Sequence, residues 1–466
     1  MNRAIPLVLA VALFMETMDS TIISTALPSI AADIGTNPIA LKLALTSYFV
    51  SLAIFIPVSG WMADRYGARR VFRAAILVFV VGSVACAIAG SLLEFVGARF
   101  LQGMGGAMMT PVGRLILVRS TPRAQLVSAM AWLTMPALIG PLLGSPVGGF
   151  ITTFFSWHWI FIINVPIGLI GVVLSGWVLP EMPGGNAGRI DWPGFFLAGV
   201  AASGVVFGLS VISMPALPPV VGAVTLILGI VAAAAYVRHV RRTPAPILDI
   251  RLFANPVLRI SILAGIIFRI GIGAAPFLLP LMFQLGFGMN PLESGLLTFA
   301  TAVGAMSVKV IVGWMLKRMG FRIVLIIAIA TGSLLIAAPG LFTPQTPYWL
   351  IIATLILMGF ARAMFFTSSN ALLFADIDER QMAQASALAS VSQQVSIAMG
   401  VAVAGMLLEA HHVITGQELD MAAFSMTFFV VGALSALALI PLFQLAPDAG
   451  NNISGHTPKT AASSKE

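Results

Sequence analysis

Two carboxylates three residues apart, Glu16 and Asp19, stand inside the first long apolar run of the sequence. On a helix this spacing places both side chains on one face. An ionised acid at bilayer depth costs at least ~2.5–3.5 kcal/mol, so a residue of this kind is a functional candidate by default. We therefore expect a proton-binding site in which the two acids titrate as a coupled pair.

A matching positive charge, Arg99, lies in the fourth apolar run. At 1.5 Å per residue, Asp19 lies about 21 Å from the inner end of its run and Arg99 about 12 Å from the outer end of its own. In a hydrocarbon core of ~30 Å these depths are similar, so we expect the two side chains to pair. The alternative is a static salt bridge with a purely structural role.

Two further arginines, Arg269 and Arg362, fall near the middle of apolar runs in the second half of the sequence. We expect no acid at their depth in that half. Unpaired arginines facing a cavity would favour an anionic substrate. The alternative is that each binds backbone carbonyls or an acid of the first half. The other candidates for substrate binding within the runs are Gln102, Asn370, Gln393 and Gln394, and Asn164 and Ser369 are further polar candidates there.

The composition says which elements must hold these residues. Of 466 residues, 59% are hydrophobic and only 9% are charged, against about 25% charged in a soluble domain. Most of the chain must therefore be dissolved in lipid, as an all-α integral membrane protein. We expect fourteen transmembrane helices, at residues 5–27, 40–61, 72–92, 94–117, 127–152, 157–180, 192–211, 218–237, 258–286, 292–316, 322–342, 347–373, 382–408 and 422–446.

Basic residues set the orientation. Only five lie within or at the edge of a predicted span, namely Lys42, Arg99, Arg269, Lys309 and Arg362. The others fall on the connections that share a side with the N-terminus, or at the termini. This asymmetry predicts that both termini are cytoplasmic, and it accounts for the net charge of +8 without nucleic acid as a partner.

An internal repeat divides the chain. The segment GWMADRYGARRV, Gly60 to Val71, returns as GWMLKRMGFRIV, Gly313 to Val324. Two related halves are typical of transporters that alternate access about a central site. We predict a six-helix half at 1–180, two additional helices with their linkers at 181–257, a second six-helix half at 258–446 and a disordered cytoplasmic tail at 447–466.

Five segments resemble motifs of the major facilitator superfamily, in its fourteen-span drug:proton antiporter branch. They are GWMADRYGARR in the loop, MDSTIISTALPSI in the first span, ARFLQGMGGAMM in the fourth, IGPLLGSPVGG in the fifth and SWHWIFIINVPIG in the sixth. The resemblance implies a major facilitator fold and proton-coupled export of small molecules. Ser145 and His158 depart from the common glycine and arginine of these motifs, and Lys317 stands in the second loop where the first has Asp64.

The loop and fifth-span motifs imply gating residues. We expect Asp64, Arg65 and Arg69 to form a charge network that closes the cytoplasmic side, and the fifth span to bend at its glycine and proline residues. The full set of gating candidates is Gly60, Asp64, Arg65, Gly67, Arg69, Gly140, Pro141 and Gly144.

The remaining expectations concern energy source and partners. No phosphate-binding Gly-Lys-Ser/Thr motif is present, so a proton gradient drives transport and no cofactor or metal is needed. We expect a monomer in the inner (cytoplasmic) membrane whose partners are protons, lipid and a small-molecule substrate. The alternatives are a proton-coupled exporter of an organic anion, such as citrate or a metal chelate, and a membrane sensor or enzyme on a transporter-like bundle.

Overall fold

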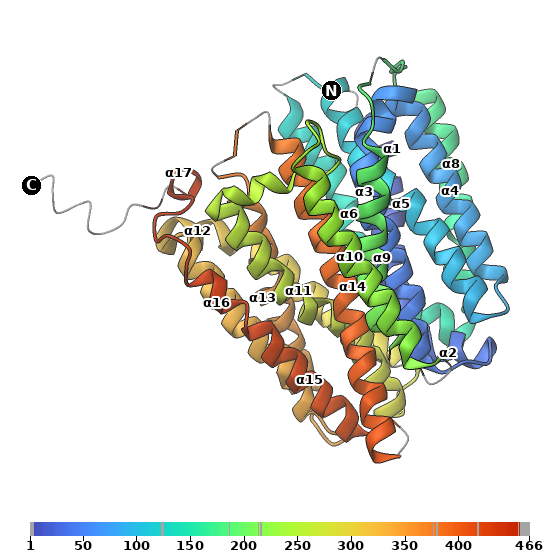
Figure 1. Ribbon diagram of the computed structural model, residues 1–466. Coiled ribbons are helices and arrows are strands. Elements are labelled where there is room, and N and C mark those ends of the chain that lie inside the picture. Colours follow the sequence, from blue (N-terminus) through green and yellow to red (C-terminus); the bar gives the residue numbers. More distant parts are fainter. Residues whose placement is uncertain are drawn as a thin grey trace, which may run out of the picture. The chain divides into compact units, whose positions relative to one another are not determined.

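The computed structural model describes residues 4–122, 125–185, 187–212, 214, 217–375, 377–378, 381–416, 419–454 and 456, and every regular element in these ranges is helical (Figure 1). Two compact units are present. The first comprises Met1–Ile247 with Pro280–Phe299, and the second comprises Leu248–Leu279 with Ala300–Glu466.

The helices of the first unit carry most of the sequence motifs. They are α1 (Ala4–Ile22), α2 (Leu27–Asp33), α3 (Lys42–Tyr66), α4 (Ala68–Ile88), α5 (Leu92–Ser120), α6 (Leu126–Phe154), α7 (Trp159–Ile162), α8 (Asn164–Val178), α9 (Trp192–Val211) and α10 (Pro219–Val240). Short 3-10 turns occupy Ile23–Thr25 and Pro38–Leu41.

The second unit continues the helical pattern. Its elements are a 3-10 turn at Ile250–Ala254, α11 (Pro256–Leu281), α12 (Pro291–Ala337), a 3-10 turn at Ala338–Leu341, α13 (Tyr348–Leu372), α14 (Met382–Thr415), α15 (Met421–Ala436), α16 (Leu439–Leu442) and α17 (Asn451–Ser454). The end of α11, a π-helical turn at Met282–Gly286 and the start of α12 belong to the first unit.

Twelve helices of the described part are long and apolar enough to cross a membrane. They coincide with twelve of the fourteen predicted spans. The other two, 94–117 and 292–316, are helical within α5 and the first part of α12, but they are not among the twelve. The all-helical membrane fold is therefore confirmed, while the count of fourteen stays a prediction.

Both copies of the repeated loop segment contain a glycine with a positive φ. Gly67 separates α3 from α4 with a φ of 93°, and Gly320 breaks the helical geometry of α12 with a φ of 73°. A side chain is strained in this conformation, which explains why the repeat keeps glycine at both positions.

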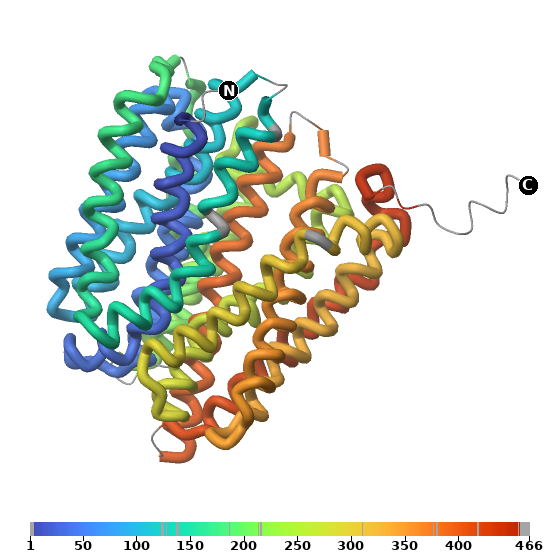
Figure 2. Tube along the Cα trace, turned by 180° about the vertical axis from the view of Figure 1, so that it is seen from behind, coloured from blue at the N-terminus to red at the C-terminus, as the bar shows by residue number. Residues whose placement is uncertain are grey.

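In the first unit, α1 packs against α5, α6 and α8 (Figures 1 and 2). Glycines on one face of α6 permit the closest of these approaches. A Cβ atom at Gly140 would overlap Thr17, and one at Gly144 would overlap Thr21. Small residues on a helix face let backbones approach closely in a membrane. The fifth-span glycines thus fix α1 against α6, and bending at Pro141 stays a prediction because α6 is one continuous helix.

The two additional helices, α9 and α10, pack on each other through glycine. Gly204 meets Gly229 across the pair, and the large apolar side chains of both helices are largely exposed, as expected for helices facing lipid. On α3, Phe55 lies 5.9 Å from the ring of Phe195 on α9.

One expectation about the tail is wrong for its first residues. Residues 447–454 form turns and the short helix α17 instead of a disordered segment. Asn452 donates a hydrogen bond to the carbonyl of Ala375, 3.0 Å away, and this contact holds the segment against the turn after α13.

Candidate functional site

The predicted pairing of Asp19 with Arg99 is present. Arg99 Nη1 lies 2.7 Å from Asp19 Oδ2, and both side chains are almost completely buried. A buried ion pair is stable only when further hydrogen bonds satisfy the remaining polar atoms. The neighbouring helices supply those bonds.

Two side-chain amides donate further hydrogen bonds to the Asp19 carboxylate. Gln102 Nε2 donates to Asp19 Oδ1 at 2.8 Å, and Asn164 Nδ2 at the start of α8 donates to the same oxygen at 2.9 Å. Gln102 also donates to Ser83 Oγ on α4 at 2.9 Å and accepts from Arg99. The Asp19 carboxylate thereby joins α1 to α5 and α8, and Gln102 extends the network to α4 through Ser83.

Gln102 therefore has a different role from the one expected. The sequence assigned it to substrate binding, but it is buried and its amide is bonded to Asp19, Ser83 and Arg99. Because it lies three residues after Arg99 on α5, the two side chains share a helix face and reach the same acid.

The other acid of α1, Glu16, lies one turn from Asp19 in a different environment. It is half-buried, and Thr110 Oγ1 on α5 donates a hydrogen bond to Glu16 Oε2 at 2.6 Å. Neither an arginine nor a lysine pairs with Glu16 within the described residues. The two acids thus share a helix but not a set of partners.

Sequence reasoning did not single out Tyr48, Ser83 or Thr110, which all lie in this site. Tyr48 on α3 is 1% exposed, and its ring centroid lies 4.3 Å from the Arg99 guanidinium carbon. The position of Tyr48 well inside a predicted span could have marked it as a functional candidate, because tyrosines of membrane proteins concentrate at the membrane–water interfaces. A serine or threonine in an apolar run carries no comparable signal.

The second unit holds the other predicted arginines. Arg269 on α11 is 2% exposed, and its guanidinium carbon lies 5.5 and 5.2 Å from the ring centroids of Phe365 and Phe366 on α13. Gly265, one turn earlier on α11, leaves the room that the guanidinium occupies. In the described part of the chain Arg269 makes no ion pair, and its Nε has no hydrogen-bond partner.

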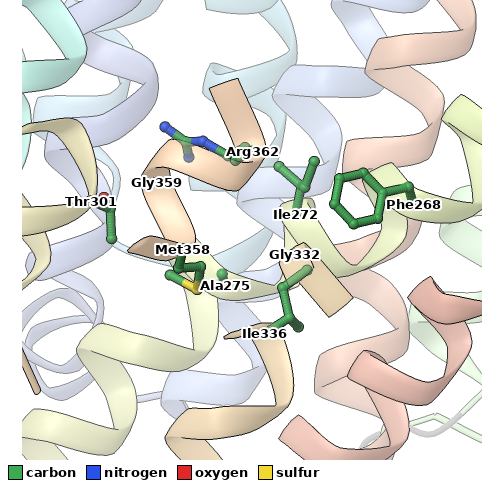
Figure 3. A pocket seen from close by; sticks show the side chains of 9 residues that line it. All are labelled: Phe268, Ile272, Ala275, Thr301, Gly332, Ile336, Met358, Gly359 and Arg362. Carbon is green, nitrogen blue, oxygen red and sulfur yellow. The ribbon is translucent and has the colours of Figure 1, made fainter. Parts of the chain in front are cut away.

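Arg362 lies one turn before Phe366 on α13 and lines a cavity of about 20 Å³, room for about one water molecule. The rest of the lining is mainly apolar, and Figure 3 shows the guanidinium directed away from the ring of Phe268. Arg362 makes no ion pair among the residues described.

One acid of the second unit lies outside the predicted span boundaries. Helix α14 continues to Thr415, so Glu409 belongs to it and is buried at 5% exposure. Glu409 has interactions of its own, but neither Arg269 nor Arg362 is its partner.

The remaining substrate candidates are less enclosed. Asn370 is exposed, while Gln393 and Gln394 on α14 are both half-buried. The structure brings none of these three into hydrogen-bond contact with Arg269 or Arg362 within the ranges it describes.

The charge network expected in the first loop has different partners. Asp64 pairs with Arg119 at 2.8 Å instead of with Arg65 or Arg69. Arg69 donates to the carbonyl of Gly176 and lies 3.8 Å from Glu181. Arg65 is exposed, and an added Cβ at Gly60 would meet no atom within 4 Å.

The linker after α8 covers this loop. Gly185 N donates to the carbonyl of Asp64 at 2.7 Å, and Trp61 Nε1 donates to the carbonyl of Gly188 at 2.7 Å. The absence of a side chain at Gly67 makes room for the carbonyl of Met182. The first loop is thus held by backbone contacts with the linker as well as by charge.

Comparison with known proteins agrees with this architecture. The family model described as the Major Facilitator Superfamily matches residues 9–254 and 261–465. A protein of Yersinia enterocolitica named "Putative multidrug resistance protein MdtD" is 35% identical over 452 residues, which is 96% of this chain and 95% of that protein. A protein of the same name from Pectobacterium carotovorum is 36% identical over 443 residues, 94% of this chain and 95% of its own length.

Solved structures show the same fold at lower sequence identity. A D-xylose-proton symporter matches with a TM-score of 0.69 at 17% identity, covering 96% of this chain and 98% of its own. The nucleoside transporter NupG matches with a TM-score of 0.65 at 15% identity, covering 96% of this chain and 100% of its own. Together with the family match over nearly the whole length, these findings show that the chain belongs to the major facilitator superfamily.

Proposed function

We propose that this protein is a proton-coupled antiporter that exports small molecules across the cytoplasmic membrane by alternating access. The observation that carries the proposal is the placement of two acids, Glu16 and Asp19, within one membrane-spanning helix, with Arg99 paired to Asp19. Acids at membrane depth mark proton pathways in transporters.

The relatives support the direction and the type of cargo. Two proteins more than a third identical over most of their length carry names that describe multidrug resistance. Export of toxic compounds is what such a name describes, and uptake would not confer resistance. The protein then acts as a monomer with both termini in the cytoplasm, and the proton gradient is its energy source.

Purified protein in proteoliposomes tests the proposal. An interior pH dye and an imposed proton gradient report whether adding ethidium moves protons in the direction opposite to the cargo. We expect proton-driven ethidium movement that a Glu16→Gln/Asp19→Asn double variant lacks. Proton flux that persists unchanged in the double variant would reject the acids of α1 as the coupling site. Ethidium binding by the wild-type protein without any flux would favour the sensor alternative.

A second candidate function, export of an organic anion, follows from Arg269. This arginine is buried without a carboxylate partner among the described residues, and Arg362 on α13 makes no ion pair among them either. A positive charge kept at membrane depth without a counter-ion favours a negatively charged substrate.

The two candidates differ in the transported charge. In the same proteoliposomes, citrate as an anion and ethidium as a cation are compared in Arg269→Ala and Arg362→Ala. Loss of citrate export with retained ethidium export supports the anion exporter, and no effect on either cargo removes it. Lys309→Gln is the matched control, since it deletes one exposed positive charge from α12 of the same unit.

A further inference from the structure

The two acids of α1 differ in how many of their acceptor positions are already used. Asp19 accepts from Arg99 on one oxygen and from Gln102 and Asn164 on the other. Protonating Asp19 would break charge-assisted bonds and leave the Arg99 guanidinium unpaired in a buried site. The Asp19 carboxylate therefore holds α1 against α5 and α8.

Glu16 has fewer hydrogen-bond partners than Asp19. Among the described residues, one side-chain hydrogen bond reaches Glu16, from Thr110 to Oε2, so Oε1 is left for a proton or for another donor. The side chain is half-buried, so part of its surface stays accessible. Of the two acids, Glu16 is the one that can change its protonation state without breaking an ion pair.

A buried donor without a partner lies next to Glu16. The hydroxyl of Tyr48 is buried and makes no hydrogen bond to any residue that the structure describes. A Cβ atom added at Gly106 would lie 3.1 Å from this hydroxyl and 3.6 Å from Glu16 Cγ. The two side chains therefore flank the same glycine, whose missing side chain leaves the space between them open. The face of the Tyr48 ring meanwhile covers Arg99.

We propose that Glu16 is the proton-exchanging group and that Tyr48 is a positioning residue linking its charge to the Arg99–Asp19 pair. When Glu16 is ionised, its free oxygen accepts a hydrogen bond from the Tyr48 hydroxyl. When Glu16 takes a proton from water, that bond is lost and the ring over Arg99 is released. Tyr48 keeps its phenolic proton throughout, Arg99 stays charged, and the proton on Glu16 returns to water on the other side of the membrane.

Few other charges can influence Glu16. Its own helix contributes Asp19, α3 contributes Tyr48, and α5 contributes Arg99 and the exposed Arg114 one turn beyond Thr110. The other helices packed on α1 are α6, α7 and α8, and their sequences contain no ionisable side chain. A pH dependence of the transport step is therefore assignable to this small set.

The proposal rests on the proposed proton coupling, so the test reads titration separately from transport. Infrared spectra of the purified full-length protein are recorded between mildly acidic and mildly alkaline pH, and the carboxylic-acid C=O band is followed. We expect a titrating band that disappears in Glu16→Gln. We expect its midpoint to move to higher pH by about one unit in Tyr48→Phe, because the ionised form loses one donor and a tenfold change in proton affinity is one pH unit.

The control is Ser47→Ala, which removes the neighbouring buried hydroxyl of α3, bonded to the carbonyl of Val96 at 2.9 Å. It should leave the midpoint unchanged. A titrating band that survives in Glu16→Gln overturns the assignment of Glu16, and an unshifted midpoint in Tyr48→Phe overturns the role of the hydroxyl. If the Glu16 band titrates as expected while the wild-type protein moves no protons with ethidium or citrate, the proposed function fails and the inference about titration stands.

Discussion

Each of the two units buries an arginine, but the side chains that surround the two arginines differ. Arg99 is 1% exposed and Arg269 is 2% exposed, so both have lost nearly all contact with solvent. Arg99 has a carboxylate at 2.7 Å and an amide acceptor, with the ring of Tyr48 over its face. Arg269 has only two phenylalanine faces, and no acid of the described residues pairs with it.

This difference indicates that the charge of Arg99 has a structural role, whereas the charge of Arg269 is available to a ligand. Removing a charge from solvent costs several kcal/mol, and a well-bonded counter-ion recovers most of that cost. An aromatic face recovers about 2 kcal/mol when the pair is desolvated. The first arrangement is complete without a ligand, whereas the second is improved by any anion that reaches the guanidinium.

Removing Arg99 should have the largest effect. In Arg99→Met the Asp19 carboxylate stays buried without its counter-ion, which costs about 3–5 kcal/mol. We expect a large fall in the melting temperature of the detergent-solubilised protein. The double variant Asp19→Asn/Arg99→Met removes both charges and should recover part of the loss. A single variant as stable as the wild-type protein would contradict the structural role of the pair.

The repeated loops allow a second comparison. Gly67→Ala forces an alanine into a φ of 93° and towards the carbonyl of Met182, whereas Gly320→Ala meets only the edge of His456, at 3.2 Å. The backbone strain alone is about 1–3 kcal/mol at either site. We therefore expect both variants to melt at lower temperature than the wild-type protein, and Gly67→Ala at the lowest.

The matched control for the loops is Gly60→Ala, in the helical part of the same repeat with no atom near the added methyl. It should be neutral or stabilising by roughly 0.5–1 kcal/mol, since alanine suits a helix interior better than glycine. Equal losses in Gly67→Ala and Gly320→Ala would show that the linker contact at Met182 adds nothing.

Arg269→Met sharpens the contrast between the arginines. No counter-ion is stranded by this change, and an uncompensated charge is replaced by an apolar side chain of similar length. We expect a free energy of unfolding within about 1 kcal/mol of the wild-type value, or higher. A loss as large as that of Arg99→Met, measured by thermal unfolding, would mean that Arg269 is a structural residue after all.

The smallest expected effect concerns an ion pair outside the spans. Arg251 donates hydrogen bonds to Asp249, which holds the pKa of that carboxyl below its usual value. Because the pKa is lowered in the folded protein, this contribution is present above the unfolded pKa of about 3.9 and is lost as the pH falls through the folded pKa. The melting temperature of Asp249→Asn should be slightly lower than that of the wild-type protein at neutral pH, and the difference should vanish in strong acid.

Much of this molecule could be predicted from local sequence properties. Long apolar runs predict helices and their approximate bounds, because a span must satisfy its own backbone hydrogen bonds in lipid. The rise per residue was enough to place Asp19 and Arg99 at one depth, and the structure confirms that they pair.

Other features were beyond prediction because they depend on the rotation of each helix about its axis. Depth says that Gln102 lies near Asp19, but only packing decides that its amide is consumed there and not offered to a substrate. The same holds for Asp64, whose partner is Arg119 on α5 and not its loop neighbours. Side chains far apart in sequence meet only when the helices are assembled.

The sequence by itself determined that lipid surrounds most of the chain, that the fold is helical and that the loop segment is repeated. It also determined which buried charges must be explained. It did so because few charges and long apolar runs admit one kind of structure. The tertiary structure alone decided that, within the described part of the chain, Asp19 is fully bonded while Glu16 keeps a free oxygen beside a tyrosine hydroxyl that makes no hydrogen bond. That distinction arises from which helix faces α1 meets, since neighbours three residues apart on one helix can face different partners.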